Sequence, residues 1–293
     1  MHTFTAYPSL TEFYRKLRGG SQPVLVAAEN QNLYVVKFSN NLQGENVLFN
    51  EAMGTALYRA CGLSTPDWTP LRVTKAFLRR FPGCWLQNAK GAVQPADGLC
   101  FGSLYQGSAA QVIEIMPSPS LKRVNNLDTF WMAWVIDVCA NHTDNRQALF
   151  LPNDESGAFT AVFIDHGNLF GGPKGGKAAR LFEARYLDQR VYQYVSSCYL
   201  RMISGIIREL DVDKLWRQAA ELPSEWRTDS ALREFSSCLN RLADGQHIQK
   251  LIDTLWEVVF SQPNARAFTN PYRPKPPASV LCAGVQACRG QGS

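Results

Sequence analysis

The hydrophobic pattern changes its period partway along the chain. Before about residue 116, apolar residues cluster in short runs typical of strands, among them VLVAAE (24–29) and LYVVKF (33–38), which an Asn-rich turn joins. From about residue 127, apolar residues such as Phe130, Trp134 and Val138 recur at helical spacing. The pattern predicts an α+β fold with a small strand-rich lobe over 1–116 and a larger, mainly helical lobe over 117–262.

Local signals refine the first lobe. Ser9, followed three residues later by Glu12, forms a capping-box pattern and predicts a short helix over 9–18. Gly19, Gly20 and Ser21 then form a glycine-rich turn at the entrance of the hairpin. A helix is predicted over 45–61, ending at Gly62, and a strand within 65–74. QVIEIM (111–116) is a candidate buried strand, whereas 82–107 shows no clear period.

In the second lobe, the helix from residue 127 is followed by QALFL (147–151) and FTAVFID (159–165), two strand-like runs around a polar turn. A glycine-rich loop follows, and apolar residues at helical spacing then predict helices over 187–202 and 248–259. The last segment, 263–293, is rich in proline and small residues and is predicted to be a disordered tail.

Composition and charge narrow the function classes. With 45% hydrophobic and 19% charged residues, the chain has enough apolar mass for a core, which excludes wholesale disorder. The net charge of +5 suggests a polyanionic partner, but the tail carries four basic residues and no acid, so the rest of the chain is nearly neutral. Without a helix-turn-helix pattern or a basic stripe, a nucleic-acid-binding module is the least supported hypothesis.

The chain is expected to be cytoplasmic and to have no membrane partner. Its first residues lack the apolar core of a signal peptide, and its longest apolar stretch is interrupted by Asp137 and too short to span a bilayer. The eight cysteines are scattered without a zinc-site spacing and are expected to be mostly buried and reduced. A disulfide between Cys282 and Cys288 in the tail is an alternative for that pair alone.

Lys37 stands inside an apolar strand, where an unpaired charge is costly to bury. One interpretation is an edge lysine that faces solvent, because strand periodicity gives it the same face as Val35. The glycine-rich turn before it and the helix after it favour a lysine that holds nucleotide phosphates. Glu51 in that helix would fix this lysine, with Glu45 as the rival partner and a solvent-facing glutamate as the plain alternative.

Two further segments carry candidate chemistry. NHTDNRQALF (141–150) places Asp144 in a loop just after a helix, where it can accept a hydroxyl proton, and Gln147 offers an oxygen for magnesium. AVFIDHGNLFGG (161–172) ends a buried run with Asp165, a geometry suited to a magnesium ligand. Alone, Asp144 also fits a polar turn and Asp165 a strand-end cap, and His166 is expected to be structural.

The order of these elements, together with YVVKFSNNLQGENVLFNE and GLSTPDW, resembles the HipA-like kinases of bacteria over about residues 15–260. That resemblance implies a bilobal kinase-like fold, with ATP and Mg²⁺ bound between the lobes. It implies that Lys37 holds the phosphates with Glu51 as its partner, that Asp144 is catalytic, and that Asp165 and Gln147 hold the metal. It also implies a phosphate-covering loop and an interlobe hinge for adenine, formed by Gly19, Gly20 and Ser21 and by Glu114, Ile115 and Met116, respectively.

One departure from the kinase pattern leaves two functions open. The usual loop asparagine, five residues after the aspartate, is replaced here by Leu149, so Gln147 must substitute for it. The leading hypothesis is an ATP- and Mg²⁺-dependent phosphotransferase acting on a hydroxyl, either Ser/Thr of a protein or a small molecule. The alternative is a pseudokinase, a nucleotide-binding interaction scaffold. The resemblance does not extend to an antitoxin partner.

Overall fold

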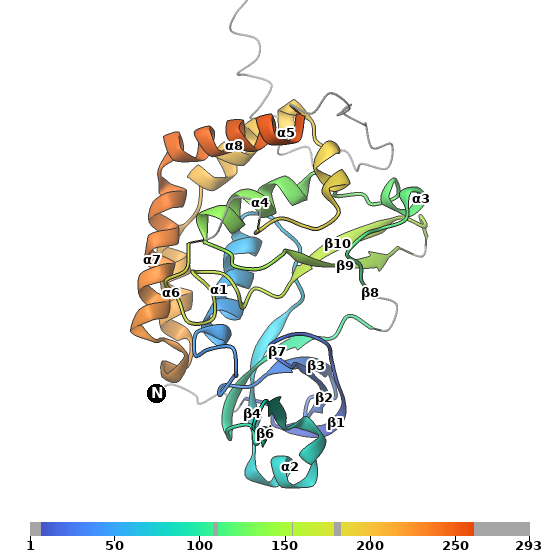
Figure 1. The fold of residues 1–293 in the computed structure, drawn as a ribbon, viewed down its shortest axis with the longest axis vertical. Coiled ribbons are helices and arrows are strands. Elements are labelled where there is room, and N and C mark those ends of the chain that lie inside the picture. Colours follow the sequence, from blue (N-terminus) through green and yellow to red (C-terminus); the bar gives the residue numbers. More distant parts are fainter. Residues whose placement is uncertain (1–6, 108–110, 154, 179–182, 261–293) are drawn as a thin grey trace, which may run out of the picture.

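The computed structural model describes residues 7–107, 111–153, 155–178 and 183–260. Figure 1 shows a strand-rich lobe at one end, a helical lobe at the other, and a hairpin and one central helix between them. The predicted tail, 263–293, with its Cys282–Cys288 alternative, lies outside the described residues.

The first lobe is built on a five-stranded sheet of antiparallel pairs in the order β1-β2-β3-β7-β4. Its strands are β1 (Leu10–Lys16), β2 (Val24–Ala28), β3 (Leu33–Lys37), β4 (Trp68–Val73) and β7 (Gly98–Leu104). The β2–β3 hairpin and the β4 strand confirm the predictions for 24–38 and 65–74. The segment between β4 and β7 forms an outer cap of α2 (Lys75–Arg80), a 3₁₀ turn η1 (Pro82–Cys84), β5 (Leu86–Asn88) and β6 (Gly91–Val93).

The predicted helix over 9–18 is wrong, because these residues form β1. Leu10 to Lys16 pair with β2 along its length, and Leu10 is buried in the sheet's own hydrophobic core. Glu12, the expected capping residue, instead accepts a hydrogen bond from Arg80 of α2. A capping box is a local signal, and pairing with a strand that the chain forms later overrides it.

The helix α1 (Val47–Ala60) confirms the prediction for 45–61, and Gly62 follows it with a φ of +77°. Most of α1 is buried, because the helix packs into the core of the helical lobe and also contacts α6. The Asn50 side chain donates to the carbonyl oxygens of Gly167 and Leu169, at 3.0 and 2.7 Å. Helix α1 is therefore anchored to the segment that follows the last strand.

The second lobe begins with a small sheet whose strand order is β10-β9-β8. The apolar helix α4 lies in the hydrophobic core of this lobe. The β9–β10 hairpin and α4 confirm the predictions for 147–165 and for the helix after residue 127. The bounds are β8 (Gln111–Val112), α3 (Ser118–Leu121), α4 (Thr129–Cys139), β9 (Gln147–Pro152) and β10 (Phe159–Ile164).

Four longer helices complete this lobe (Figure 1): α7 and α8 contact α4, α5 contacts α7 and α8, and α6 contacts α1. The four helices are α5 (Ser197–Arg208), α6 (Val212–Glu221), α7 (Asp229–Ala243) and α8 (Gly245–Phe260). Two 3₁₀ turns accompany them, η2 (Gln189–Gln193) before α5 and η3 (Ser224–Trp226) before α7. Helix α8 confirms the prediction for 248–259. The prediction for 187–202 is wrong in its first half, because Ser196 caps the helix by accepting a hydrogen bond from the Tyr199 amide, and Leu187 is exposed.

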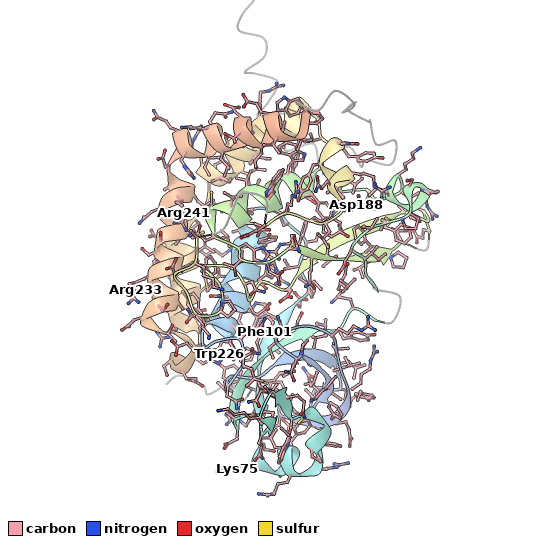
Figure 2. The ribbon with its side chains drawn as sticks, viewed as in Figure 1. Lys75, Phe101, Asp188, Trp226, Arg233 and Arg241 are labelled. Carbon is pink, nitrogen blue, oxygen red and sulfur yellow. The ribbon has the colours of Figure 1, made fainter. Side chains whose placement is uncertain are left out.

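The two lobes meet through aromatic contacts. The Trp68 ring of β4 stacks on Phe101 of β7, with ring centroids 5.2 Å apart, and lies 6.4 Å from the ring of Trp226 in η3. Figure 2 shows Phe101 and Trp226 near this junction. Within the described residues, no helix is both long and apolar enough to cross a membrane.

Candidate active site

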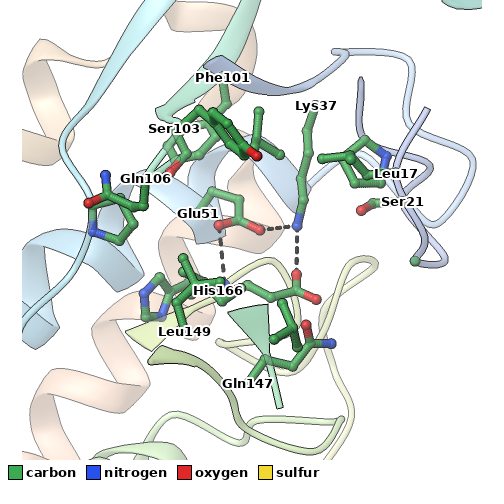
Figure 3. Close-up of a pocket in the computed structure, with 18 of the residues that line it drawn as sticks. Leu17, Ser21, Lys37, Glu51, Phe101, Ser103, Gln106, Gln147, Leu149 and His166 are labelled. Atoms are coloured by element: carbon green, nitrogen blue, oxygen red, sulfur yellow. Dashed lines mark hydrogen bonds and ion pairs between the residues drawn. The ribbon is translucent and has the colours of Figure 1, made fainter. Parts of the chain in front are cut away.

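A cavity of about 460 Å³ lies between the five-stranded sheet and the β9–β10 hairpin. The sheet side supplies apolar walls from Leu17, Pro23 and Val35, and the hairpin side supplies Leu149 and Ile164. Lys37 and Glu51, labelled in Figure 3, contribute charged groups to the lining, and Asp165 contributes a third. Apolar walls with a few convergent charges are the usual composition of a small-molecule site.

Lys37 joins these charges. Its ammonium donates hydrogen bonds to Glu51 Oε1 and to Asp165 Oδ1, the second at 2.6 Å. Only 9% of the Lys37 side chain and 4% of the Glu51 side chain are exposed, so neither of the solvent-facing alternatives holds. Glu45 is exposed and is not the partner. The structure therefore brings together three residues that the sequence had placed on a strand, on a helix and at a strand end.

Glu51 also anchors the backbone that follows Asp165. Its two carboxylate oxygens accept hydrogen bonds from the amides of His166 and Gly167, at 3.1 and 2.9 Å. A Cβ added to Gly167 would lie 2.9 Å from Glu51 Oε1, so the absence of a side chain allows this close approach. Asp165 itself has a φ of +59°, a left-handed conformation that is uncommon for a non-glycine residue. One carboxylate thus orients both Lys37 and the Asp165–Gly167 turn.

These charged groups shift one another's pKa values. Burial alone would lower the pKa of Lys37, but attraction to Asp165 and Glu51 raises it above its ordinary value, so the lysine stays charged. Burial would raise the pKa of Asp165, but Lys37 and then Arg146 lower it to about 2. Burial raises the pKa of Glu51 although Lys37 opposes this shift. The Asp165 side chain is 25% exposed, so an ionised carboxylate faces the cavity.

Gln147 and Leu149 both line the cavity from β9. They stand two residues apart on a strand and share one face, while the intervening Ala148 is buried on the other. Gln147 is paired with Ile164, the residue just before Asp165. Gln147 therefore reaches the cavity beside the turn that carries Asp165, and Leu149 adds to the apolar wall.

Asp144 lies on a loop that is attached to the segment following Asp165. Its side chain is exposed and does not line the cavity, but its Oδ2 accepts a hydrogen bond from Asn168 Nδ2 at 3.3 Å. The Thr143 amide donates to the carbonyl oxygen of Asn168 at 3.0 Å. The loop that carries Asp144 is therefore attached to the segment just after Asp165. Asn168 makes both hydrogen bonds of this attachment and was not predicted from the sequence.

The glycine-rich turn lies over the cavity, but its residues differ in position. Gly19 and Ser21 line the cavity, whereas Gly20 does not, and a Cβ at Gly20 would lie 2.6 Å from the side-chain nitrogen of Gln43. Arg15 and Arg18 also line the cavity and were missed, because the sequence analysis placed them in a helix. Arg15 on β1 and Arg18 just after this strand add basic side chains to the cavity lining.

The predicted hinge at Glu114, Ile115 and Met116 is wrong in position. Ile115 is 70% exposed, and the backbone of Met116 is engaged by Asp188 and Arg190, which bond its amide and its carbonyl oxygen. None of these three predicted hinge residues lines the cavity. Residues 104–106, where β7 leaves the first lobe, line it instead. The register of β7 against β3 decides this, and the weak period over 82–107 concealed it.

The cavity offers the hard oxygen ligands that magnesium prefers. The Asp165 carboxylate and the Gln147 side chain both reach it, and a nucleotide would add phosphate oxygens. Across the part of the chain that the structure describes, no cluster of three or more His, Cys, Asp or Glu side chains has metal-binding geometry. Such a donor set fits a metal held jointly by protein and nucleotide, because magnesium at a phosphate site needs only one or two protein ligands.

Comparison with solved structures shows the class of fold. The chain is similar to hydra Fam20 in a structure with sugar, with a TM-score of 0.54, 11% identity and 89% of each chain covered. It is similar to the Golgi casein kinase with Mn/ADP bound, with a TM-score of 0.52, 12% identity and 91% of this chain and 77% of that chain covered. It is also similar to the Helicobacter pylori proinflammatory kinase CtkA, with a TM-score of 0.50, 11% identity and 85% and 97% covered.

These similarities establish a protein kinase-like α+β fold with a strand-rich first lobe and a helical second lobe. At 11–12% identity they show the fold alone. No protein-family model matches the chain, and no curated protein sequence matches it. The kinase-like part of the sequence prediction is therefore confirmed, and the narrower HipA-like resemblance is not.

Proposed function

We propose that this protein is an ATP- and Mg²⁺-dependent phosphotransferase that transfers the γ-phosphoryl group to a hydroxyl. The observation that carries the proposal is Lys37, held between Glu51 and Asp165 in a largely apolar cavity. Phosphoryl transfer depends on such positioned charges more than on covalent chemistry. The kinase-like fold, and the Mn/ADP in the Golgi casein kinase structure, agree with this proposal.

The lining suggests how a nucleotide would be held. The base would lie between the apolar side chains of Val35 and Leu149, with its edge toward residues 104–106. Its phosphates would then extend toward Lys37 and the turn at Gly19 and Ser21. A lysine with a fixed carboxylate partner keeps its charge in place for this role.

Asp165 and Gln147 would hold Mg²⁺ together with the phosphates. Bound there, the metal neutralises the charge that develops on the phosphoryl oxygens. Asp144 would accept the proton of the acceptor hydroxyl. The oxygen of that hydroxyl would bond to the γ-phosphorus while the bond between the γ-phosphorus and the leaving ADP breaks. The exposure of Asp144 leaves room for an acceptor as large as a protein Ser or Thr.

Nucleotide binding provides the first test. We expect ATP with Mg²⁺ to raise the thermal unfolding temperature of the parent protein, and Asp165→Ala to lose most of the metal-dependent part of that shift. Asp253→Ala, an exposed position on α8, is the matched control. The absence of any shift in the parent at millimolar ATP would reject the proposal, and transfer of labelled phosphate to a protein or small molecule would establish the reaction.

A pseudokinase is the second candidate, because Lys37 engages the very carboxylate that would hold the metal. An interaction scaffold could bind nucleotide without activating it for transfer. ATP binding with no detectable transfer, under conditions where metal binding is saturated, would favour this alternative.

A further inference from the structure

Behind the cavity lies a buried ion pair that the proposed reaction does not use directly. Asp137, on α4, accepts two hydrogen bonds from Arg146, from Nη2 to Oδ1 at 2.7 Å and from Nε to Oδ2 at 2.9 Å. Neither side chain is more than 1% exposed. Burying two charges is costly, and well-packed apolar residues would often serve stability as well or better. Stability alone therefore gives little reason for charges at this place.

The other end of the Arg146 guanidinium contacts the backbone that carries Asp165. Nη1 donates to the carbonyl oxygens of Ile164, at 2.8 Å, and of Asp165, at 3.3 Å. These two carbonyls lie on either side of the Asp165 α-carbon, which has the left-handed φ of +59°. A non-glycine residue persists in this conformation only when its surroundings hold it there. The planar guanidinium, fixed by Asp137, provides such a hold.

The same ion pair also reaches α1. Tyr58 Oη donates to Asp137 Oδ1 at 2.6 Å, and the Arg146 guanidinium lies over the Tyr58 ring, 4.9 Å from its centroid. Helix α1 thus reaches the Asp165 turn directly through Glu51 and Asn50, and indirectly through Tyr58 and the ion pair. A shift of α1 would act on both at once.

We infer that Arg146, held by Asp137, is a positioning residue for Asp165. It fixes the backbone turn that directs the Asp165 carboxylate into the cavity, and it couples that direction to the position of α1. The functional consequence, an oriented metal ligand, rests on the proposed phosphotransferase activity, whereas the structural part can be tested without any nucleotide.

The test compares backbone hydrogen exchange and metal-dependent ADP binding in substituted full-length proteins. Arg146→Lys keeps the charge but cannot make a bidentate contact with Asp137 and also reach both carbonyls. The double variant Asp137→Leu with Arg146→Met removes both charges together, which avoids an unpaired buried charge if the lysine variant fails to fold. Arg241→Lys is the matched control, because Arg241 on α7 (Figure 2) donates its hydrogen bonds to the Cys139 carbonyl oxygen at the end of α4 and to the Ser237 hydroxyl, not to the Asp165 turn.

In Arg146→Lys we expect the amides of His166 and Gly167 to exchange about tenfold faster or more, while β9 amides and the Arg241→Lys protein match the parent. The gain in ADP affinity that Mg²⁺ brings should fall by a similar factor, with metal-free ADP binding unchanged within about twofold. Parent-like exchange at these two amides in a folded variant would overturn the inference. A parent protein that binds no ADP would reject the proposed function, and the exchange result would still decide the role of Arg146.

Discussion

Gln147 and Leu149 share one face of β9, and both line the cavity that contains Lys37. The spacing from Asp144 had suggested that Leu149 occupies the position of a lost polar ligand. The two-residue period of the strand shows instead that a polar and an apolar position follow each other along one face. Gln147 thus reaches the cavity two residues before Leu149, and the different roles that we propose for these two positions can be tested.

Leu149→Asn should weaken nucleotide binding rather than improve catalysis. The substitution places an amide in the apolar wall where the base would lie, and an unpaired polar group there is costly to desolvate. We expect ATP affinity to fall about tenfold, measured by calorimetry, with the Mg²⁺ requirement unchanged. Higher phosphotransferase activity in this variant would show that position 149, rather than Gln147, is where the metal ligand belongs.

Asp144→Asn should separate turnover from binding. Asp144 does not line the cavity, so its loss should leave the affinity for ATP with Mg²⁺ within about twofold of the parent. Removing a general base typically lowers kcat by about 10² to 10⁴-fold, and we expect a decrease in that range. Asn145→Ala, a neighbouring exposed position, is the control. Parent-like kcat in Asp144→Asn would assign proton transfer to another group.

Lys37→Met should destabilise the fold as well as abolish nucleotide binding. It leaves the Glu51 carboxylate buried without its cation, and breaking a buried pair in this way typically costs about 3–5 kcal/mol. Lys75→Met is the control, because Lys75 is exposed and lies 4.0 Å from Asp97 (Figure 2). Its effect should be under about 1 kcal/mol. Urea unfolding of both variants checks the difference, and equal losses would contradict it.

Two glycines inside helices should respond in opposite directions to alanine. A Cβ at Gly54 of α1 would lie 2.5 Å from the His166 Cβ and 2.6 Å from Leu169 Cδ1, so Gly54→Ala should push α1 away from the Asp165 turn and destabilise the protein. Gly205 of α5 has open space around its Cβ position, so Gly205→Ala should stabilise by about 0.5–1 kcal/mol through helix propensity. Thermal unfolding of the two variants provides the measurement, and a stabilising Gly54→Ala would show that this contact is loose.

Buried thiols predict a loss of stability at alkaline pH. Burial raises the pKa of Cys61 and of Cys139 from 9.0 to about 12. A thiol whose pKa is raised by folding contributes its stabilisation fully below pH 9 and loses it as the pH rises toward 12. Each thiol can contribute a slope of up to about 1.4 kcal/mol per pH unit in that window.

Substituting both thiols by alanine should therefore flatten the fall of unfolding free energy between pH 9 and 12. The exposed Cys198→Ala variant is the control and should keep the parent slope. Denaturant titrations at several pH values measure these slopes. An unchanged slope in the double variant would show that other groups, such as the buried tyrosines, account for the alkaline loss.

The sequence was sufficient for most elements with a strong period. The β2–β3 hairpin, α1, α4 and the β9–β10 hairpin follow from alternation or helical spacing within a few residues, because burial of one face imposes that spacing locally. The pairing of Lys37 with Glu51 was also accessible, since an apolar strand rarely carries an unpaired lysine, whereas the direct contact of Lys37 with Asp165 was not predicted. Their order along the chain then indicated the kinase-like fold.

Other parts were not accessible, because they depend on residues distant along the chain. Pairing with β2 turned 10–16 from an expected helix into a strand, and this brought Arg15 and Arg18 to the cavity. The register of β7 moved the cavity wall from 114–116 to 104–106. These outcomes depend on competition between local propensity and long-range pairing, which no short window of sequence contains.

The sequence by itself therefore determined three chemical groups that meet at the cavity: a lysine, a helix carboxylate and a strand-end aspartate. Only the tertiary structure decided their geometry, including the turn of Asp165 and the hold of Arg146 and Asp137 on it. The reason is physical. Residue type and the spacing of apolar residues reflect the free-energy cost of burying each side chain. The direction of a carboxylate depends instead on hydrogen bonds from segments that meet only in the folded chain.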